Sequence, residues 1–365
     1  MTHSTPDVFP TQLTVGLDVG DKRTHLCTVD AARQPVARGT FPTTRDRLVA
    51  ALKPFPGATV FLEAGSQSPW MSRAIRELGH KVQVVDPRRV ELISKDPRKT
   101  DRRDAEMLAK MGSAMPELLG SVHHRGESAQ AHLSIVRARD LLVRQRTMAV
   151  QQVRSISKAF GLTLPSATTD GFAAKVTPLI PSMLEPALTP VLATITHLSR
   201  SIRDFDKLLA KLASEHYPEV QRLQQIDGVG PVISVAFVLS VEDPKRFTSS
   251  RQIGSWLGLC PRSHASGDSS PELRISKAGD GRLRRLLTQG AQRILGPFGR
   301  DCDLREFGLK IAIRGGKSAK KRAITAVARK LAVLMHKLWI SGANYDPLHL
   351  ANQRNHAQAD VPVSV

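Results

Sequence analysis

The stretch that decides the fold is LTVGLDVGDKRTHLCTVD, residues 13–30. Apolar and β-branched residues fill both of its ends, and the residues VGDK at positions 19–22 have the composition of a tight turn. The pattern predicts two strands, Leu13–Asp18 and Thr24–Asp30, joined as a hairpin. The first strand ends on a carboxylate, so a charged group follows directly on a run that is typical of a buried strand.

Strand and helix patterns alternate from this hairpin to residue 86. After a third, weaker strand at Val36–Phe41, the sequence predicts a helix at Thr43–Leu52, a strand at Thr59–Glu63, a helix at Ser68–Leu78 and a strand at Lys81–Asp86. Three consecutive strands followed by alternating helices and strands indicate a mixed α/β sheet with helices on its faces. That order is used by the ribonuclease H-like fold, which we expect for a first domain at residues 12–120.

The middle of the chain, residues 121–220, has helical periodicity. Apolar residues recur every seven positions in residues 127–160, and at steps of three and four between Ile195 and Leu212, as in a coiled-coil seam. The residues between, 161–190, are rich in Pro, Thr and Ser and are expected to form a connection or a loose tip. The pattern predicts a long helical hairpin or coiled coil, either as an oligomerisation arm or as part of an ordinary core.

The rest of the chain is expected to form a helical domain at residues 221–342. A glycine-rich turn is followed by an apolar helix, a loop over residues 260–278 and several basic helices. The polar residues 343–365 are expected to be a flexible tail.

Charge indicates the kind of partner. The chain has 53 Lys and Arg against 33 Asp and Glu, a net charge of +20, and most of this excess follows residue 120. A basic surface favours a polyanion, because each neutralised phosphate releases condensed counterions. Charge alone does not separate an enzyme from a generic nucleic-acid-binding protein.

Cysteine spacing and hydropathy indicate the compartment. Cys27, Cys260 and Cys302 are isolated, which excludes the usual zinc spacings and a disulfide framework. The N-terminus has no signal-peptide pattern, and no stretch approaches the roughly 20 apolar residues of a membrane span. We expect a cytoplasmic protein with no membrane partner.

Four carboxylates are candidates for metal-assisted chemistry. Asp18 and Glu63 end predicted strands, and Asp101 and Asp104 are three residues apart, which places both on one face of a helix. Carboxylate oxygens are the ligands that hard cations take. One or two magnesium ions held there would assist cleavage of a phosphodiester.

Two other interpretations of these residues remain open. Asp101 and Asp104 also fit a capped helix start with an acid in its first turn, and a lone acid at a strand end is usually solvated. The turn after Asp18 also resembles the phosphate-binding hairpin of sugar kinases and actin-like ATPases. The chain has no later glycine-rich nucleotide motif, and a net charge of +20 is unusual for a metabolic kinase.

Two segments of the C-terminal domain contain candidate functional residues. The run IDGVGP at residues 226–231 is typical of a helix-hairpin-helix, in which the backbone around Gly228 and Gly230 meets a nucleic-acid phosphate. A plain turn between helices is the alternative. Downstream, Ser266 and Gly267 lie in a loop ahead of a basic helix, where the hydroxyl can be presented to a phosphate, although a Ser-Gly pair is more often a turn.

Taken together in order, these residues resemble a known family over about residues 12–340. The chain is similar to transposases of the insertion-sequence one-ten family, recombinases with a DEDD tetrad. The matching pieces are GLDV at 16–19, LEA at 62–64, KTDRRDA at 99–105, the IDGVGP run, Phe247, LGLCP at 257–261, SG at 266–267 and SKAG at 276–279 with LR at 283–284. Each piece alone is not specific to this family, but the occurrence of all of them in this order is.

The resemblance implies a mechanism and partners. Asp18, Glu63, Asp101 and Asp104 would coordinate Mg²⁺, and Ser266 would form a covalent phosphoserine link with DNA. The family uses a structured noncoding RNA to pair with element ends and target, and its members act as homo-oligomers, dimers or tetramers, in the bacterial cytoplasm at the nucleoid. The expected nucleic-acid contacts are Gly228, Gly230, Lys277, Arg282, Arg284 and Arg285.

The chain departs from the expected pattern at one place. The five residues after Gly267 run from Asp268 to Glu272 and are more acidic than expected, and Ser263, Ser269 and Ser270 leave the register of the nucleophile open. We prefer Ser266 because a glycine follows it. The alternatives are a metal-dependent junction resolvase that hydrolyses with water, and a nucleic-acid-binding protein without catalysis.

Overall fold

The computed structural model describes residues 13–93, 100–262, 273–316, 318–350 and 352–353. The chain divides into two compact units, Met1–Gly126 and Glu127–Val365. Each unit has its own core and is described by itself.

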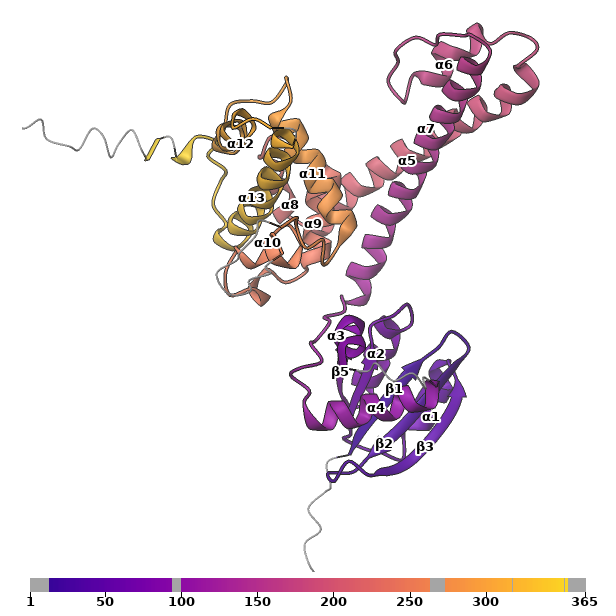
Figure 1. Ribbon diagram of the computed structural model, residues 1–365, viewed down its shortest axis with the longest axis vertical. Helices are drawn as coiled ribbons and strands as arrows, with labels where there is room; N and C mark the ends of the chain where they lie inside the picture. The colour runs from indigo at the N-terminus through magenta and orange to yellow at the C-terminus, as the bar shows by residue number, and fades with distance from the viewer. Residues whose placement is uncertain (1–12, 94–99, 263–272, 317, 351, 354–365) are drawn as a thin grey trace, which may run out of the picture. The chain divides into compact units, whose positions relative to one another are not determined.

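The first unit is built on a five-stranded mixed sheet (Figure 1). Its strands are β1 (Thr14–Val19), β2 (Arg23–Val29), β3 (Pro35–Pro42), β4 (Thr59–Glu63) and β5 (Lys81–Val85). Their order is β3-β2-β1-β4-β5, with β1, β2 and β3 antiparallel and β4 and β5 parallel to β1. The predicted mixed sheet is therefore confirmed, and strand bounds differ from the prediction by one residue at most.

Helices cover both faces of this sheet. Its helices are α1 (Arg45–Leu52), α2 (Ser68–Glu77), α3 (Pro87–Ile93) and α4 (Asp101–Ala114). Alternate residues of β1 and β4 point to opposite faces, so Leu17 and Leu62 pack with α1 and α2, whereas Phe61 packs with Leu108 of α4. This alternation assigns Asp18 and Glu63, the next residues along, to the α4 face.

The second unit begins with two long helices that pack along each other, α5 (Glu127–Ala159) and α7 (Glu185–His216), as Figure 1 shows. Their near ends, at Val136 and Leu209, join the main core of the unit. Their far ends form a separate core with Phe172 of α6 (Phe172–Val176), and a 3-10 helix η1 (Thr177–Leu179) follows. We call α5, α7 and the segment between them the arm, and this far end its tip.

The tip differs from the loose connection expected for residues 161–190. Helix α7 begins at Glu185 and runs through Pro190. A proline in the first turns of a helix removes few hydrogen bonds, and burial of Leu188 and Phe172 favours the ordered form.

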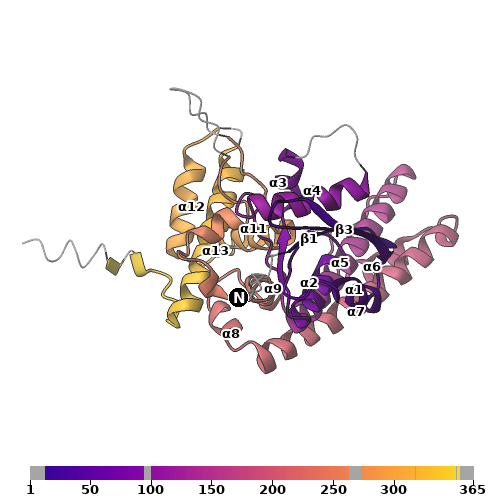
Figure 2. The ribbon, with the colours of Figure 1, turned by 90° about the horizontal axis from the view of Figure 1, so that it is seen from below.

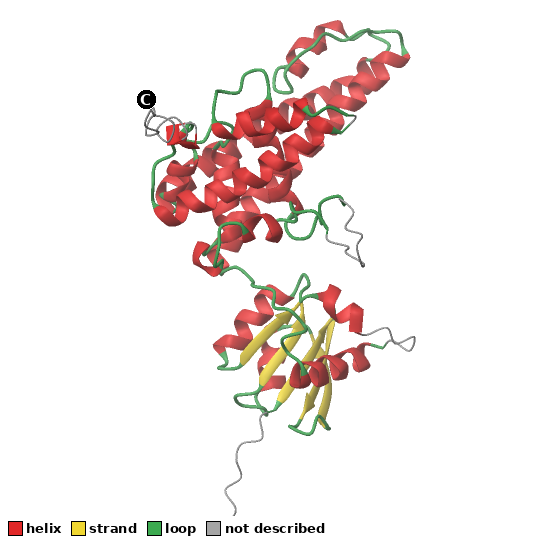
Figure 3. Cartoon of the chain, turned by 60° about the vertical axis from the view of Figure 1, so that its left-hand side comes forward, coloured by secondary structure: helices red, strands yellow, loops and turns green. Residues whose placement is uncertain are grey.

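The rest of the second unit is a helical body around α9 (Pro231–Val241), whose residues from Ile233 onward are all buried. The surrounding elements are α8 (Glu219–Leu223), η2 (Pro244–Arg246), α10 (Gln252–Trp256), α11 (Gly281–Leu295), α12 (Asp303–Ile313) and α13 (Ala319–Ser341). Helices α12 and α13 lie side by side (Figure 2). All of the named strands belong to the first unit (Figure 3), so the predicted succession of a mixed sheet and a mostly helical region is confirmed.

Residues 344–350 of the expected tail lie against this body. The amide of Tyr345 donates to Gln225 Oε1 at 2.8 Å, and the amide of Leu350 donates to Asp303 Oδ2 at 2.7 Å. Separately, among the described helices of the chain, none is long and apolar enough to cross a membrane.

Candidate active site and nucleic-acid interface

The carboxyl ends of β1 and β4 carry the first two candidate carboxylates. These strands are parallel, and Leu17 is paired with Leu62. The next residue of each strand is Asp18 and Glu63 respectively, so the two lie side by side at one sheet edge. Both are half-buried and lie on the face that α4 covers.

A close backbone contact brings α4 to the same edge. A Cβ atom added at Gly16 would lie 2.2 Å from the carbonyl oxygen of Ala105, closer than any real contact. Only glycine therefore allows β1 and α4 to approach this closely. Because Ala105 follows Asp104 and Gly16 is two residues before Asp18, the contact brings Asp104 to the Asp18 end of β1.

The remaining carboxylate, Asp101, begins α4. It lies in the first helical turn with Asp104, and the preceding Thr100 makes no side-chain capping bond. The side chain of Asp101 is 75% exposed, and its Oδ2 lies 3.5 Å from Nε2 of His25.

His25 is a residue of this site that the sequence analysis missed. On β2 it is paired directly with Asp18, and its Nδ1 lies 2.9 Å from the hydroxyl of Thr40 on β3. If that hydroxyl donates, the Nε2–H group of His25 faces Asp101. The hairpin pattern was the signal that could have revealed it, because a tight turn at residues 19–22 places position 25 opposite position 18.

The four carboxylates have the donor chemistry of a divalent-cation site. All are oxygen ligands, and their three elements meet at one edge of the sheet, so the residues fit such an ion. Within the described residues, however, no three His, Cys, Asp or Glu side chains form a preformed metal cluster. Rotation of side chains such as the exposed Asp101 would be needed to bring the oxygens together around an ion.

A buried contact supports the loop after Glu63. The hydroxyl of Ser68 donates to the carbonyl of Gly65 and accepts from its amide, and it lies 2.7 Å from Nε2 of His124. Burial, and after it the positive charge of the nearby Arg76 and Arg73, lowers the pKa of His124 to about 4. A neutral imidazole therefore holds this loop at neutral pH.

In the second unit, two loops that match the resemblance interlock. The amide of Lys277 donates to Gly258 O, and the amide of Ser276 donates to Cys260 O. Gly258 and Gly279 have positive φ, and a Cβ at either would lie about 2 Å from the backbone of the other loop. The motifs LGLCP and SKAG are thus two halves of one rigid frame.

Ser266, the predicted nucleophile, lies outside the described residues, as do Ser263, Ser269 and Ser270. The residues that flank this segment belong to the frame. The amide of Arg262 donates to Arg274 O at 3.0 Å, and Pro261 forms a β-bridge with Ile275. The ends of the segment are therefore held close together.

The predicted basic contacts differ in their surroundings. Arg284 donates to the carbonyls of Leu257 and Ala278, so it stabilises the frame from within. Lys277 is exposed at the edge of the frame.

The other two predicted arginines share one carboxylate. Asp140 of α5 accepts from Arg282 at 3.2 Å and from Arg285 at 2.5 Å, with Arg144 nearby at 3.6 Å. Burial raises the pKa of Asp140, but the hydrogen bonds from Arg285 and Arg282 outweigh it, so the pKa lies below its ordinary value. Three arginines around one aspartate leave a positive surface.

Two arginines that are not among the predicted nucleic-acid contacts lie at the glycine loop of residues 226–231. The amide of Arg300 donates to Asp227 Oδ2 at 3.1 Å. A Cβ at Gly228 would lie 3.5 Å from Cβ of Arg293, because this loop packs on Gly290 of α11. Their proximity to the loop could not be predicted from the sequence, since each is more than 60 positions downstream.

Comparison with known proteins identifies the family. Residues 15–160 match a DEDD transposase family of IS110 type, and residues 220–300 match the family described as "Transposase IS116/IS110/IS902 family". A probable family 20 transposase of Pseudomonas aeruginosa is 31% identical over 77% of this chain and 83% of its own length.

Two further relatives carry names of insertion-sequence transposases. That of IS1111A from Coxiella burnetii is 29% identical over 89% of this chain and 88% of its own length. That of IS1328 from Yersinia enterocolitica is 30% identical over 78% of this chain and 84% of its own length. Transposases bind DNA and transfer its phosphoryl groups, and a DEDD domain implies a divalent metal ion. The chain belongs to the IS110 family of transposases, with a DEDD domain at its N-terminus and the family's second domain at its C-terminus.

Proposed function

We propose that this transposase recombines the DNA of a bacterial insertion sequence through a covalent phosphoserine link formed by Ser266. The observation that carries the proposal is the convergence of Asp18, Glu63 and the start of α4 on one sheet edge. The interlocked frame that holds the ends of the segment containing Ser266 supports it.

In the proposed mechanism the four carboxylates would hold Mg²⁺, and the ion would supply positive charge that stabilises a phosphoryl group. Asp18 and Glu63 are fixed by their strands. His25, whose Nε2 lies 3.5 Å from Asp101 Oδ2, helps to keep this exposed carboxylate near the sheet edge. His124 keeps the loop after Glu63 in place by its contact with Ser68.

The transfer itself conserves the phosphodiester bond. The Ser266 oxygen forms a bond to phosphorus while the bond from phosphorus to one deoxyribose oxygen breaks. The serine proton passes to a base, and the departing deoxyribose oxygen gains a proton. In the second step a free DNA hydroxyl attacks the phosphoserine, which rejoins DNA and restores the serine. Serine is a weak nucleophile at neutral pH and requires activation.

We assign the remaining finer features in the same way. The first unit takes the ribonuclease H-like fold, and the glycine loop acts as a helix-hairpin-helix whose Gly228 and Gly230 meet phosphate. Lys277, Arg282 and Arg285 contact nucleic acid, whereas Arg284 supports the frame. A structured noncoding RNA pairs with element ends and target, which leaves the protein to recognise shape and charge. The enzyme acts as a homo-oligomer in the bacterial cytoplasm.

The test combines the full chain, Mg²⁺, RNA transcribed from the flanks of the gene, and labelled DNA carrying those flanks. We expect a protein–DNA adduct that survives denaturation and is lost in Ser266→Ala. Ser263→Ala, Ser269→Ala and Ser270→Ala are matched controls that should keep it.

Other results would assign other functions. Free cleaved DNA, unchanged in Ser266→Ala, would identify a junction resolvase that uses water. Binding without any cleavage by the wild-type chain would identify a non-catalytic protein. Omission of the RNA separately tests guidance.

A further inference from the structure

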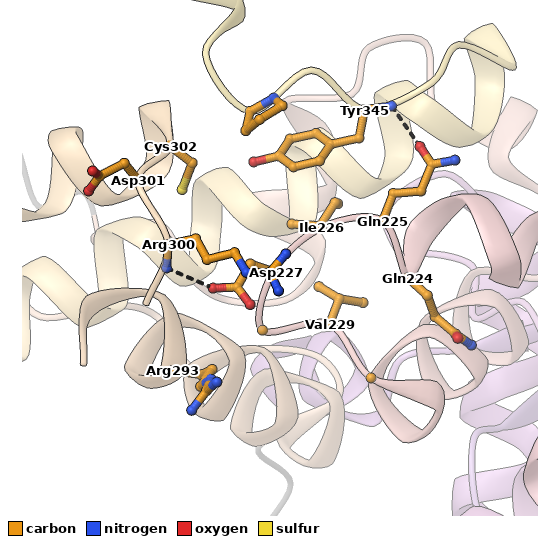
Figure 4. A pocket seen from close by; sticks show the side chains of 13 residues that line it. Gln224, Gln225, Ile226, Asp227, Val229, Arg293, Arg300, Asp301, Cys302 and Tyr345 are labelled. Atoms are coloured by element: carbon orange, nitrogen blue, oxygen red, sulfur yellow. Dashed lines mark hydrogen bonds between the residues drawn. The ribbon is translucent and has the colours of Figure 1, made fainter. Parts of the chain in front are cut away.

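A pocket of about 610 Å³ opens beside the glycine loop (Figure 4). It is lined by residues of this loop, by Arg293 and Arg300, and by Tyr345 from the segment after α13. Its volume lies within the range of about 300–1,000 Å³ that small-molecule sites have. A single phosphate would fill only a small part of it.

One side of the pocket is cationic. The guanidinium groups of Arg293 and Arg300 make no hydrogen bond or ion pair with any residue that the structure describes. Over the same described part of the chain, the amide groups of Gly228 and Gly230 also have no acceptor. These are the donors that bind phosphate oxygens, and arginine can do so with two parallel bonds.

The other side is aromatic and polar. Figure 4 shows Tyr345 at one end of the pocket and Arg293 at the other, with Arg300 and Asp227 between them. The amide of Tyr345 is fixed by Gln225, and burial raises the pKa of its phenol, so the ring stays neutral. An anchored ring offers a surface on which a base can stack. One oxygen of Asp227 accepts from Arg300, which leaves the second to accept from a base amino group.

We propose that this pocket binds one unpaired nucleotide of the bound nucleic acid. Arg293 and Arg300 hold its phosphate, and Tyr345 stacks on its base while Asp227 accepts from it. A paired base has its hydrogen-bonding edge covered and its faces stacked, so the pocket selects nucleotides outside a duplex. The inference rests on the proposed function only in assigning the glycine loop to phosphate, and it does not involve Ser266.

The test measures binding of short oligonucleotides to the full chain in EDTA, where no strand is cut. Single-stranded DNA and RNA probes each carry one 2-aminopurine, whose fluorescence is quenched by stacking, and a matched duplex is the third probe. We expect quenching with a single-stranded probe and at least about tenfold weaker binding of the duplex. The DNA and RNA probes show which nucleic acid supplies the nucleotide.

Substitutions of the arginines, of Tyr345 and of Gly230 test the pocket. Arg293→Ala with Arg300→Ala should weaken single-strand binding about tenfold and lower the salt slope by about 0.7, because the two arginines hold one phosphate. Tyr345→Leu should abolish quenching, whereas Tyr345→Phe keeps the ring and should retain it. Gly230→Leu should block the pocket without changing charge or strain, because a Cβ there meets nothing within 4 Å and φ is −89°.

A matched pair of substitutions on α7 serves as the control. Arg200→Ala with Lys207→Ala removes the same charge from exposed positions of α7 and should leave quenching intact. Thermal unfolding identifies any variant that fails to fold. Unchanged quenching in folded Gly230→Leu and Tyr345→Leu would overturn the proposal. Equal binding of duplex and single strands without quenching would also overturn it, by reducing the pocket to a backbone contact.

Discussion

Two places in this transposase use glycine to bring backbones together, and they serve different purposes. In the first unit Gly16 lets α4 lie directly on β1, and the candidate ligands Asp18 and Asp104 are almost adjacent to that contact. In the second unit Gly258 and Gly279 interlock two loops, but the predicted nucleophile lies several residues outside the frame.

The two places differ in which residues the close backbone contacts hold in position. The candidate carboxylates belong to the same strands and helix that pack the core, so a change in packing should alter the proposed metal site directly. The frame of the second unit holds the residues that flank the segment containing Ser266. The first arrangement suits a fixed charge cluster, whereas the second holds two loops that are distant in sequence against each other.

The largest expected effect is the loss of a carboxylate at the sheet edge. Asp18→Asn should slow DNA cleavage about 1,000-fold, equivalent to about 4 kcal/mol in the barrier, because one oxygen ligand loses its charge. Gel assays of labelled DNA measure the rate. Asp46→Asn, at an exposed position in the first turn of α1, is the control and should cleave normally. A fully active Asp18→Asn would remove Asp18 from the site.

The next largest effect tests the close contact between β1 and α4 at Gly16. Gly16→Ala should destabilise the first unit by about 3 kcal/mol, because its Cβ would collide with the backbone of α4. Chemical denaturation monitored by hydrogen exchange of β1 amides measures this. Gly39→Ala on β3 is the matched control, since a Cβ there meets nothing within 4 Å. Equal stability of the two variants would contradict the argument.

Acidification should weaken the first unit through His124. Its pKa is about 4 in the folded chain, below the usual 6.5, so the unfolded chain binds the proton more readily. The contribution of His124 to stability should be constant above about pH 6.5 and fall by about 2 kcal/mol as the pH drops toward 4, allowing for partial exposure. Denaturation at several pH values measures it. His124→Gln should remove this part of the slope, and an unchanged slope would exclude His124 as its cause.

The smallest effect concerns the arginines around Asp140. Asp140→Asn should lower stability by about 1 kcal/mol, because the ion pairs that join α5 to α11 are lost. The same change should strengthen nucleic-acid binding, because it removes the negative charge beside three arginines. Denaturation and fluorescence anisotropy give the two values. Asp204→Asn, an exposed site on α7, is the control, and parallel behaviour of both variants would show a general charge effect.

Much of the first unit could be predicted because its signals are local. Alternating apolar residues and turn residues defined the strands from Thr14 to Val85, and the strand ends placed Asp18 and Glu63. His25 was not predicted as a site residue because its place in the site depends on its partner across the sheet. The sequence shows a histidine in a strand, but only the pairing register shows that it faces Asp18.

The second unit was harder to predict from the sequence because its contacts join segments that are distant along the chain. Arg284 was predicted to contact nucleic acid, and nothing in its neighbours shows that it reaches the carbonyls of Leu257 and Ala278. Proline content suggested a loose tip, yet buried Phe172 and Leu188 organise it. Composition describes the preference of a segment, and tertiary burial can override it.

The two cores of the arm have a consequence for protein engineering. The tip core around Phe172 and Leu188 is separate from the main core, and the shaft between them contains ion pairs such as Arg139–Asp206. A module with its own core can be exchanged as a unit. Tips from relatives, grafted at matching positions of α5 and α7, should therefore yield folded chimaeras whose candidate catalytic residues are untouched.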